Sequence, residues 1–433
     1  MPVTAHPLDR HFARNVTGIC GVELLWGLGM PVLIESTFLQ VFLRNLGASS
    51  FLVGLIPTLM SAGTAVFSLT SYSLTVRLAR KRGAVIAAHV AAAVPVLAFG
   101  ILLGASGIRS STLPLFLGAY SLFAIGIGLI LPAWQNYLVK IFSEERSIRA
   151  LALMMIIQSA AKLAGSLWLV QVVQRYSFSA AGSSLVFTLV GLVFLAGSFS
   201  FLLTVEEPEP LAPQAGRLRL SSLRTHAGGN RGFLLLLGTD LEYFALGGVI
   251  AFYANFATEY CGIAAALASG LFVAFAYLGG ILANTLLGWA NLLTVRDKYL
   301  VTKLSATAGI LLLAAHPVPW VFYLASLAFG ASRGTRQMVY TPAVKRLTGA
   351  RDVTLYFAVS YLLSLPFSTG LPLLNGAFLD RFARWGAWSY RGMFLGMACL
   401  SLAGLYFTLR VPWKGPGRVP EKKKDPSTEG SLD

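Results

Sequence analysis

Apolar runs long enough to cross a membrane recur from residue 16 to residue 410 of this 433-residue chain. A helix rises 1.5 Å per residue, so about 20 apolar residues cross a ~30 Å hydrocarbon core. Hydrophobic residues make up 56% of the chain and charged residues only 12%, against roughly 25% charged in a soluble domain. So few polar residues cannot cover soluble domains of this total length. The composition excludes a soluble enzyme, a secreted disulfide scaffold and a disordered chain, and predicts an all-α integral membrane protein.

The spans are predicted to be helices, because strands of membrane barrels are alternating segments of only about 10 residues. A polar stretch rich in proline and arginine at 205–231 predicts a cytoplasmic linker between two six-helix bundles, 16–204 and 232–410. Residues 1–15 are predicted to be a cytoplasmic N-terminus and 411–433 a disordered basic cytoplasmic tail. The twelve predicted helices are 16–43, 50–74, 84–105, 112–138, 150–174, 181–204, 232–258, 264–290, 298–315, 318–342, 352–377 and 389–410.

The formal net charge of +16 would suggest nucleic-acid binding in a soluble protein. Here the basic residues gather in alternate loops, which is typical of the cytoplasmic loops of a membrane protein. This asymmetry predicts cytoplasmic termini, a cell (inner or plasma) membrane location, and lipid but no nucleic acid as a partner. The loops predicted to be inside contain Arg77, Arg80, Lys81 and Arg82, then Lys140, Arg146 and Arg149, the linker arginines, Arg296 and Lys298, and Lys345, Arg346 and Arg351. The loops predicted to be outside contain Arg44, Arg109, Arg175, Arg381, Arg384 and Arg391, and the last three depart from the pattern.

The two halves of the chain can be overlaid on each other. At an offset of 205, the matching pairs are Pro114 with Pro319, Lys140 with Lys345, Arg146 with Arg351, and Gly165 with Gly370. The first helix overlays the seventh at an offset near 217, which places Glu23 on Asp240. Two parallel six-helix repeats are a transporter architecture, with the solute site near the membrane midplane between them.

This organisation resembles the major facilitator superfamily over about 16–410. The family's signature between helices 2 and 3 is a glycine, an aspartate, a second glycine and several basic residues, and the corresponding loop here runs from Tyr72 to Arg82. Its basic residues match, but Tyr72, Val76 and Ala79 replace the first glycine, the aspartate and the second glycine. The charge latch ascribed to that aspartate therefore cannot form as written, which indicates a divergent subfamily. The glycine–proline motif of proton-driven drug antiporters is also absent from the fifth helix.

Ionisable residues inside the membrane cost at least ~2.5–3.5 kcal/mol each on insertion scales, so each is expected to face a cavity or a partner. The resemblance implies that helices 1, 4, 7 and 10 line a central cavity, and six of the seven charges lie on helices 1, 7 and 10. The seven are Glu23 and Glu35 on helix 1, Lys162 on helix 5, Asp240 and Glu242 on helix 7, and Arg333 and Arg336 on helix 10.

These charges suggest two kinds of role. Arg333 and Arg336 lie about 60° apart on one helix face and could hold a carboxylate or phosphate, because each guanidinium is a planar fork of donors. Lys162 could join them or simply balance Glu23. Glu23 and Asp240 could pair with Arg336 as an inner gate or carry a coupling proton, and Glu35 and Glu242 are the next candidates for that role. Asp240 and Glu242, about 200° apart, are not expected to point the same way.

Polar and aromatic residues give less specific candidates for solute contact. They are Trp26, one turn above Glu23, Gln135 and Asn136 at the end of the fourth helix, and Tyr340 on the tenth. Trp and Tyr are also common at membrane interfaces for reasons unrelated to binding. No phosphate-binding loop, metal-binding cluster or nucleophile–base set is recognisable, so we expect no cofactor, no metal and no enzymatic activity.

We interpret the sequence as that of a secondary active transporter that moves a small polar solute by alternating access. We expect it to be coupled to protons, with an anionic or zwitterionic solute favoured. We expect it to act as a monomer. One alternative is an exporter of drugs or other amphipathic molecules, against which Arg333 and Arg336 argue. The other is a transporter-like protein that no longer transports and acts as a sensor or a membrane assembly partner.

Overall fold

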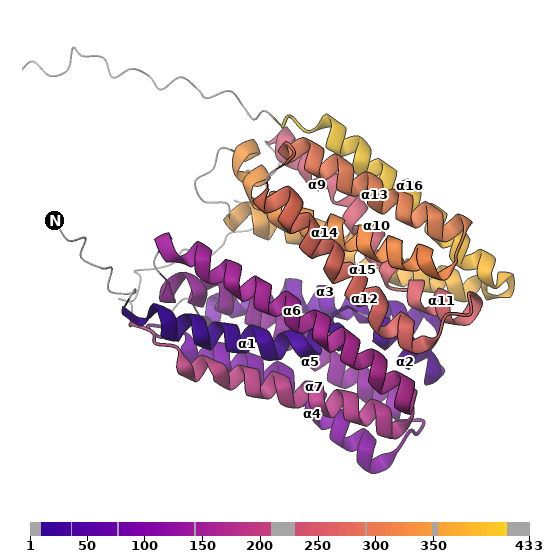
Figure 1. Ribbon diagram of the computed structural model, residues 1–433, viewed down its shortest axis with the longest axis horizontal. Helices are drawn as coiled ribbons and strands as arrows, with labels where there is room; N and C mark the ends of the chain where they lie inside the picture. Colours follow the sequence, from indigo (N-terminus) through magenta and orange to yellow (C-terminus); the bar gives the residue numbers. More distant parts are fainter. Residues whose placement is uncertain are drawn as a thin grey trace, which may run out of the picture.

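The computed structural model describes residues 10–35, 37–75, 78–142, 144–208, 230–290, 292–348 and 354–413. Every regular element within these ranges is a helix (Figure 1). The first half contains α1 (Phe12–Leu33), α2 (Thr37–Asn45), α3 (Ser50–Thr75), α4 (Arg82–Ser106), α5 (Thr112–Ile141), α6 (Glu144–Tyr176), α7 (Ala180–Ser200) and η2 (Phe201–Leu203). The second half contains α9 (Arg231–Thr239), α10 (Leu241–Ile250), α11 (Tyr253–Tyr260), α12 (Ala265–Ala283), η3 (Asn284–Trp289), α13 (Val295–Ala315), α14 (Pro319–Thr348), α15 (Thr354–Arg381), η4 (Ala383–Trp385) and α16 (Ala387–Arg410).

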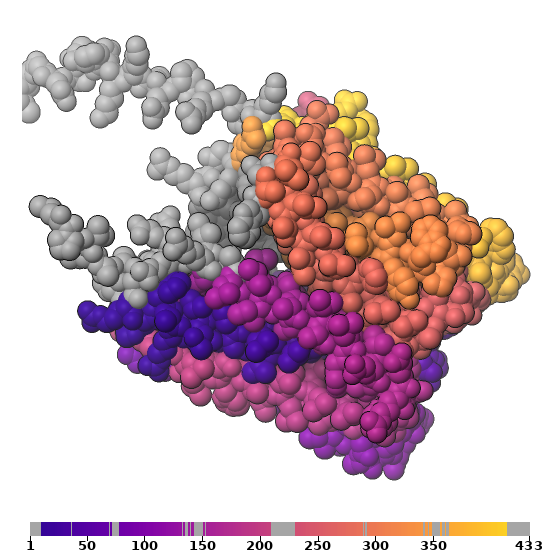
Figure 2. All heavy atoms as spheres, in the orientation of Figure 1, coloured from indigo at the N-terminus to yellow at the C-terminus, as the bar shows by residue number. Residues whose placement is uncertain are grey.

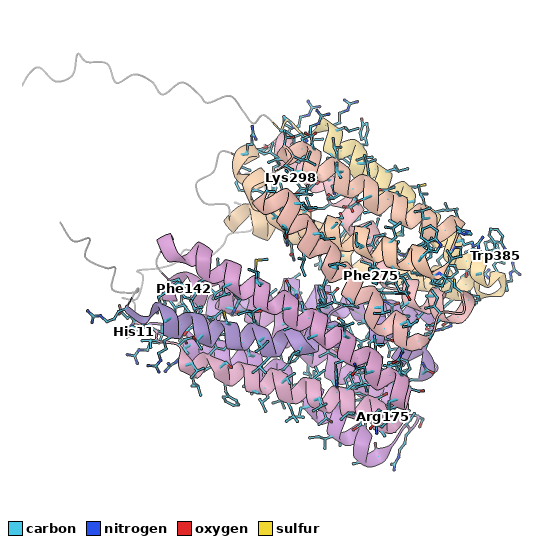
Figure 3. The ribbon with its side chains drawn as sticks, in the orientation of Figure 1. His11, Phe142, Arg175, Phe275, Lys298 and Trp385 are labelled. Atoms are coloured by element: carbon cyan, nitrogen blue, oxygen red, sulfur yellow. The ribbon has the colours of Figure 1, made fainter. Side chains whose placement is uncertain are left out.

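The helices form two groups that follow the order of the chain. Figure 1 shows α1 to α7, in indigo and magenta, below α9 to α16, in orange and yellow. The groups meet where α6 packs along α12, α3 packs along α15, and α2 contacts α11 and α12. They diverge towards the end of the molecule that carries His11, Phe142 and Lys298, which we call the linker end, and converge towards the opposite end, which carries Arg175 and Trp385 (Figure 3). In Figure 2 their surfaces meet on the right of the view, at this opposite end.

Ten helices, or runs of consecutive helices, in the described residues are long and apolar enough to cross a membrane. α14, with 30 residues, and α15, with 28, are also long enough but are not among these ten. Arg333 and Arg336 lie in the middle of α14 and lower its apolarity. The all-helical membrane fold predicted from the sequence is therefore present, and the count of twelve crossings stays a prediction.

The first and seventh predicted spans are broken, whereas the sequence suggested continuous helices at 16–43 and 232–258. The first breaks between α1 and α2, at Glu35. The seventh breaks at Asp240 and again between α10 and α11, next to Phe252. Glu35 and Phe252 are 217 residues apart, so these two breaks fall at the offset that overlays the two halves. Broken helices at membrane depth are tolerated where other groups bond the freed backbone.

Side chains at the opposite end join the two groups and satisfy backbone groups. The Gln40 side chain donates to the Ile250 carbonyl and accepts from the Ala254 amide, and so bridges the break between α10 and α11. Asp380, near the end of α15, accepts the Ser50 and Phe51 amides of α3 at 2.8 Å each. Such a carboxylate stabilises a helix start by accepting unpaired N–H groups. This end is therefore closed by contacts between the halves.

At the linker end, Glu206 binds three basic residues of the first half. Its carboxylate accepts the Lys81 and Arg82 amides at 2.6 and 2.8 Å and forms an ion pair of 2.9 Å with Lys140. In the sequence, Val76 stands where the family signature has an aspartate, in the loop before α4. In this chain Glu206, which follows η2, accepts the backbone amides at the start of α4. The loop sequence alone does not reveal this carboxylate, because it lies 124 residues after Arg82 in the chain.

Glycines allow α12 and α14 to approach closely. A Cβ at Gly330 would lie 1.7 Å from the Ala276 carbonyl oxygen, and one at Gly279 would lie 1.9 Å from the Leu327 carbonyl oxygen. No real side chain tolerates such distances, so the two backbones would have to separate. Small residues at helix contacts permit this kind of packing in membranes.

We expect Gly330→Ala to destabilise the protein by about 1–3 kcal/mol, the usual cost of overpacking a tight contact. Gly247→Ala on α10 is the matched control, because a Cβ there meets nothing within 4 Å. Thermal unfolding of both purified variants in detergent measures the difference. Equal stability of the two variants would contradict the close packing of α12 on α14.

Candidate functional site

Among the residues that the structure describes, eight Asp, Glu, Lys and Arg side chains lie within or between the helices of the two groups, away from the ends of the molecule. Seven of them are the residues singled out from the sequence. The eighth is Lys303 on α13, which is 1% exposed. Lys303 was not among the residues predicted from the sequence, although it lies inside the predicted helix 298–315. Four acids and four bases therefore balance one another, and their pairing decides which of them can act on a solute.

The first ion pair joins the two halves. Glu35, at the break after α1, accepts from Arg333 Nη1 of α14 at 2.8 Å and from the Tyr277 hydroxyl of α12 at 2.9 Å. The Arg333 side chain is 36% exposed. The hydrogen bond to Glu35 places this side chain at a contact between the two halves. Arg333 is therefore accessible and held by a single carboxylate.

Lys162 of α6 lies beside this pair. Its ammonium is 5.2 Å from the centre of the Tyr277 ring, the ring whose hydroxyl binds Glu35. In the part of the chain that the structure describes, Lys162 makes no ion pair with a carboxylate. A cation on an aromatic face gains only about 0.5–2 kcal/mol, so an anion could still bind the amine. Lys162 and Arg333 approach the same place from opposite halves.

The second ion pair lies within the second half. Arg336 of α14 binds Asp240, between α9 and α10, through two hydrogen bonds of 2.7 and 2.8 Å. The guanidinium also lies 4.3 Å from the Tyr243 ring centre and 4.6 Å from that of Tyr340. Two bonds and two aromatic faces fix Arg336 firmly. In this structure Asp240 contacts Arg336, whereas Glu23 binds Gln158. An inner gate in which both acids pair with Arg336 when the cytoplasmic side is shut stays a prediction.

The third ion pair is fully buried. Glu242 of α10 binds Lys303 at 2.8 Å and the Ser332 hydroxyl at 2.7 Å, and both charged side chains are 1–2% exposed. Lys303 also donates to the Thr239 carbonyl at 2.8 Å. Asp240 and Glu242 contact different partners, in agreement with their expected divergence around the helix. Glu242 forms a structural pair and has no surface on which to meet a solute.

Glu23 of α1 is the one acid of the four that binds no cation directly. It is 4% exposed and accepts a short hydrogen bond from the Gln158 amide of α6. Lys162 lies one helical turn further along α6. Pairing three acids with three bases thus leaves Glu23 and Lys162, on two helices that pack against each other.

The remaining sequence candidates are placed as follows. Trp26 is only 3% exposed and stacks on Phe194 at 4.2 Å, with His89 at its edge. It packs inside the first half in this structure, and its contact with a solute stays a prediction. Tyr340 is 6% exposed, and its ring contacts Arg336, which lies one turn away on the same helix, α14. The side chains of Gln135 and Asn136 lie outside those that the structure describes.

Comparison with known proteins identifies the class to which this chain belongs, that of membrane transporters. The family model described as Major Facilitator Superfamily matches residues 26–331. This covers more than half of the chain, and the chain belongs to the major facilitator superfamily. Comparison with curated proteins returned no significant match.

Solved structures share the fold at low sequence identity. A mutant of the nucleoside transporter NupG has a TM-score of 0.69 and 11% identity, and the match covers 92% of this chain and all of that one. A bacterial homologue of the human lysosomal transporter Spinster, inward-facing and unoccupied, scores 0.66 at 15% identity, covering 94% and 97%. The transporter FucP in its outward conformation scores 0.61 at 12% identity, covering 92% and 98%.

Proposed function

We propose that this protein is a proton-coupled secondary transporter that moves a small anionic or zwitterionic solute by alternating access between two six-helix bundles. One observation carries the proposal. Of the four acids and four bases described above, three of each form ion pairs with one another. The remaining amine, Lys162, lies beside the accessible Arg333 at the junction of the halves. Charged side chains inside a membrane are retained mainly for transport or proton relay.

Lys162 and Arg333 are the proposed anchors of the solute's negative group. An arriving carboxylate or phosphate would bind Lys162 and compete with Glu35 for Arg333, because the guanidinium offers several donors in one plane. Such an exchange links the two halves through the solute instead of through Glu35. Tyr277, which contacts both Lys162 and Glu35, would follow the change.

We expect Lys162→Gln and Arg333→Gln each to reduce solute uptake at least about tenfold, since a hydrogen bond to a charged group is worth ~1.5–3 kcal/mol. Arg109→Gln, in the described loop before α5, removes an exposed arginine and serves as the control. Uptake by proteoliposomes containing equal amounts of each variant provides the measurement. Uptake unchanged in both site variants would exclude the proposed anion anchors.

The proposed function includes a topology of twelve spans with both termini in the cytoplasm of a cell (inner or plasma) membrane, and a monomeric transporter. The concentration of basic residues in alternate loops supports this topology. His11, Phe142 and Lys298 lie together at the linker end, which agrees with the side assigned to those segments (Figure 3).

Reporter fusions after residues 215 and 425 are expected to give cytoplasmic signals at both positions. An even number of crossings separates the two points in the proposed topology. A fusion after residue 110, in the loop between α4 and α5, is the control and should report the outside. Opposite locations for 215 and 425 would require an odd number of crossings in the second half.

The function itself is tested by solute uptake. Proteoliposomes are exposed to labelled organic acids, amino acids, phosphorylated solutes, sugars and nucleosides, with and without an inward proton gradient. Nucleosides are included because NupG, which shares the fold, is titled a nucleoside transporter. Accumulation of an anion or zwitterion only with the gradient supports the proposal. Transport of lipophilic cations alone, or no transport of any solute, would favour the exporter or the sensor instead.

A further inference from the structure

A second basic site lies at the surface of the linker end, where the first and last helices of the second half meet. Here a cavity of about 420 Å³ lies between the start of α9 and the end of α16. Two arginines, Arg231 and Arg410, line it together with Leu235, Phe407 and Pro412. Neither arginine forms an ion pair with any residue that the structure describes. The cavity therefore combines apolar walls with two cations available to an anion.

The local structure holds the cavity open. Gly238 of α9 lies against the Phe407 ring, which sets the close spacing of α9 and α16. Beyond α16 the chain is fixed because Trp413 donates from its indole to the Thr408 carbonyl at 2.9 Å. Asn230 caps α9 by accepting the Phe233 amide at 2.9 Å, and the amides of Arg231 and Gly232 precede that capped position. Free N–H groups at a helix start favour an anion.

An apolar stripe leads along α16 into the cavity. Its members lie at helical spacing on one face, are 47–52% exposed, and are Leu395, Leu402, Tyr406 and Leu409. Tyr406 also lines the cavity, and the Arg410 guanidinium is 5.1 Å from its ring centre. In a membrane-spanning helix such an exposed face meets lipid chains. Acyl chains lying on the stripe would place their headgroup at the two arginines.

We propose that this cavity binds the phosphate headgroup of an anionic phospholipid from the leaflet at the linker end. The stripe supplies the acyl-chain contact, the arginines supply the charge, and Tyr406 supplies the amphipathic ring typical of the membrane interface. A soluble anion would use the arginines but gain nothing from the stripe. The proposal rests on the membrane position of α16 and is independent of which solute is transported.

Native mass spectrometry of the full-length protein tests the proposal. The protein is released from vesicles containing equal phosphatidylglycerol and phosphatidylcholine, and the retained lipids are counted. We expect phosphatidylglycerol to be retained preferentially. Arg231→Gln and Arg410→Gln should each weaken its retention roughly fivefold, from the attraction of a single basic residue to an anionic surface. Phosphatidylcholine retention should not change.

Arg175→Gln is the matched control, because Arg175 also stacks on a neighbouring tyrosine, at 5.5 Å from the Tyr176 ring, but at the opposite end. It should retain phosphatidylglycerol as the wild type does. Arg231→Lys and Arg410→Lys keep the charge and should keep most of the lipid, which separates binding from misfolding. Equal retention by the wild type and the glutamine variants would overturn the proposal. So would displacement of the lipid by millimolar inorganic phosphate, which would indicate a site for a soluble anion.

Discussion

Replacing Glu23 with glutamine is expected to abolish pH-driven accumulation of the solute while leaving solute-for-solute exchange largely intact. A gradient of one pH unit is worth ~1.36 kcal/mol per proton, which is about a tenfold accumulation ratio. In Glu23→Gln this ratio should fall to about one, because the amide cannot release and regain a proton. The measurement compares proton-driven uptake with counterflow at zero gradient in the same proteoliposomes.

The contacts of Glu23 explain why it is preferred over Asp240, its counterpart in the other half. Arg336 binds Asp240 through two hydrogen bonds, and both of these charge-assisted bonds would be lost if Asp240 took up a proton. Glu23 accepts from a neutral amide, Gln158, and can gain a proton without leaving a partnered cation unpaired. Lys162, the proposed solute anchor, lies one helical turn from Gln158, the partner of Glu23. Protonation of Glu23 and binding of the solute at Lys162 would therefore affect each other.

Asp240→Asn is the matched comparison for this experiment. It should slow exchange and net uptake together, as expected of a residue that holds α14 in position. Full pH-driven accumulation by Glu23→Gln would contradict the assignment and shift attention to Glu35, the remaining acid between the halves.

Removing one partner of the buried pair between Glu242 and Lys303 is expected to destabilise the protein by roughly 3–5 kcal/mol. The other charge would remain without its ion-pair partner at a place that is 1–2% exposed. Glu242→Gln leaves the lysine without its anion, and Lys303→Met leaves the glutamate without its cation. The double variant should recover much of the loss, because removing both charges restores neutrality. Unfolding of the purified proteins followed by heat or denaturant gives the comparison.

The exposed pair between Arg44 and Glu259 provides the control, because its side chains are 33% and 24% exposed. Glu259→Gln should cost only about 0–1 kcal/mol, since water screens such a pair. A loss in Glu242→Gln no larger than that in Glu259→Gln would show that the buried pair contributes little to stability.

Much of the fold could be predicted from local patterns in the sequence. Most predicted spans lie within a few residues of the observed helices, because twenty apolar residues in lipid have to satisfy their own backbone hydrogen bonds. The alternation of basic loops and the offset repeat depend only on position along the chain. The positions of Glu23, Arg333 and Arg336 on their helices follow from the same counting, whereas Glu35 lies at a break that the counting did not predict.

The partners of those charges could not be predicted in this way. Glu35 and Arg333 are 298 residues apart, and Asp240 lies 96 residues from Arg336. Which acid meets which base depends on how each helix is rotated and tilted against its neighbours, and a helix rich in apolar residues on all sides carries little information about that rotation. For the same reason the sequence could not show that Trp26, a candidate for solute contact, packs inside the first half.

The sequence by itself determined that this chain crosses a membrane and which helices carry charge, because hydrophobic length and spacing are local properties. It also predicted that the two halves repeat. Only the tertiary structure decided that Glu242 and Lys303 form a buried pair, that Arg336 is bound to Asp240, and that Glu206 caps α4. Helix packing brings the other acids and bases together as ion pairs and leaves Glu23 and Lys162 without one. That these two residues lack an ion-pair partner depends on the tertiary structure, because it follows from how all the other charged side chains are paired.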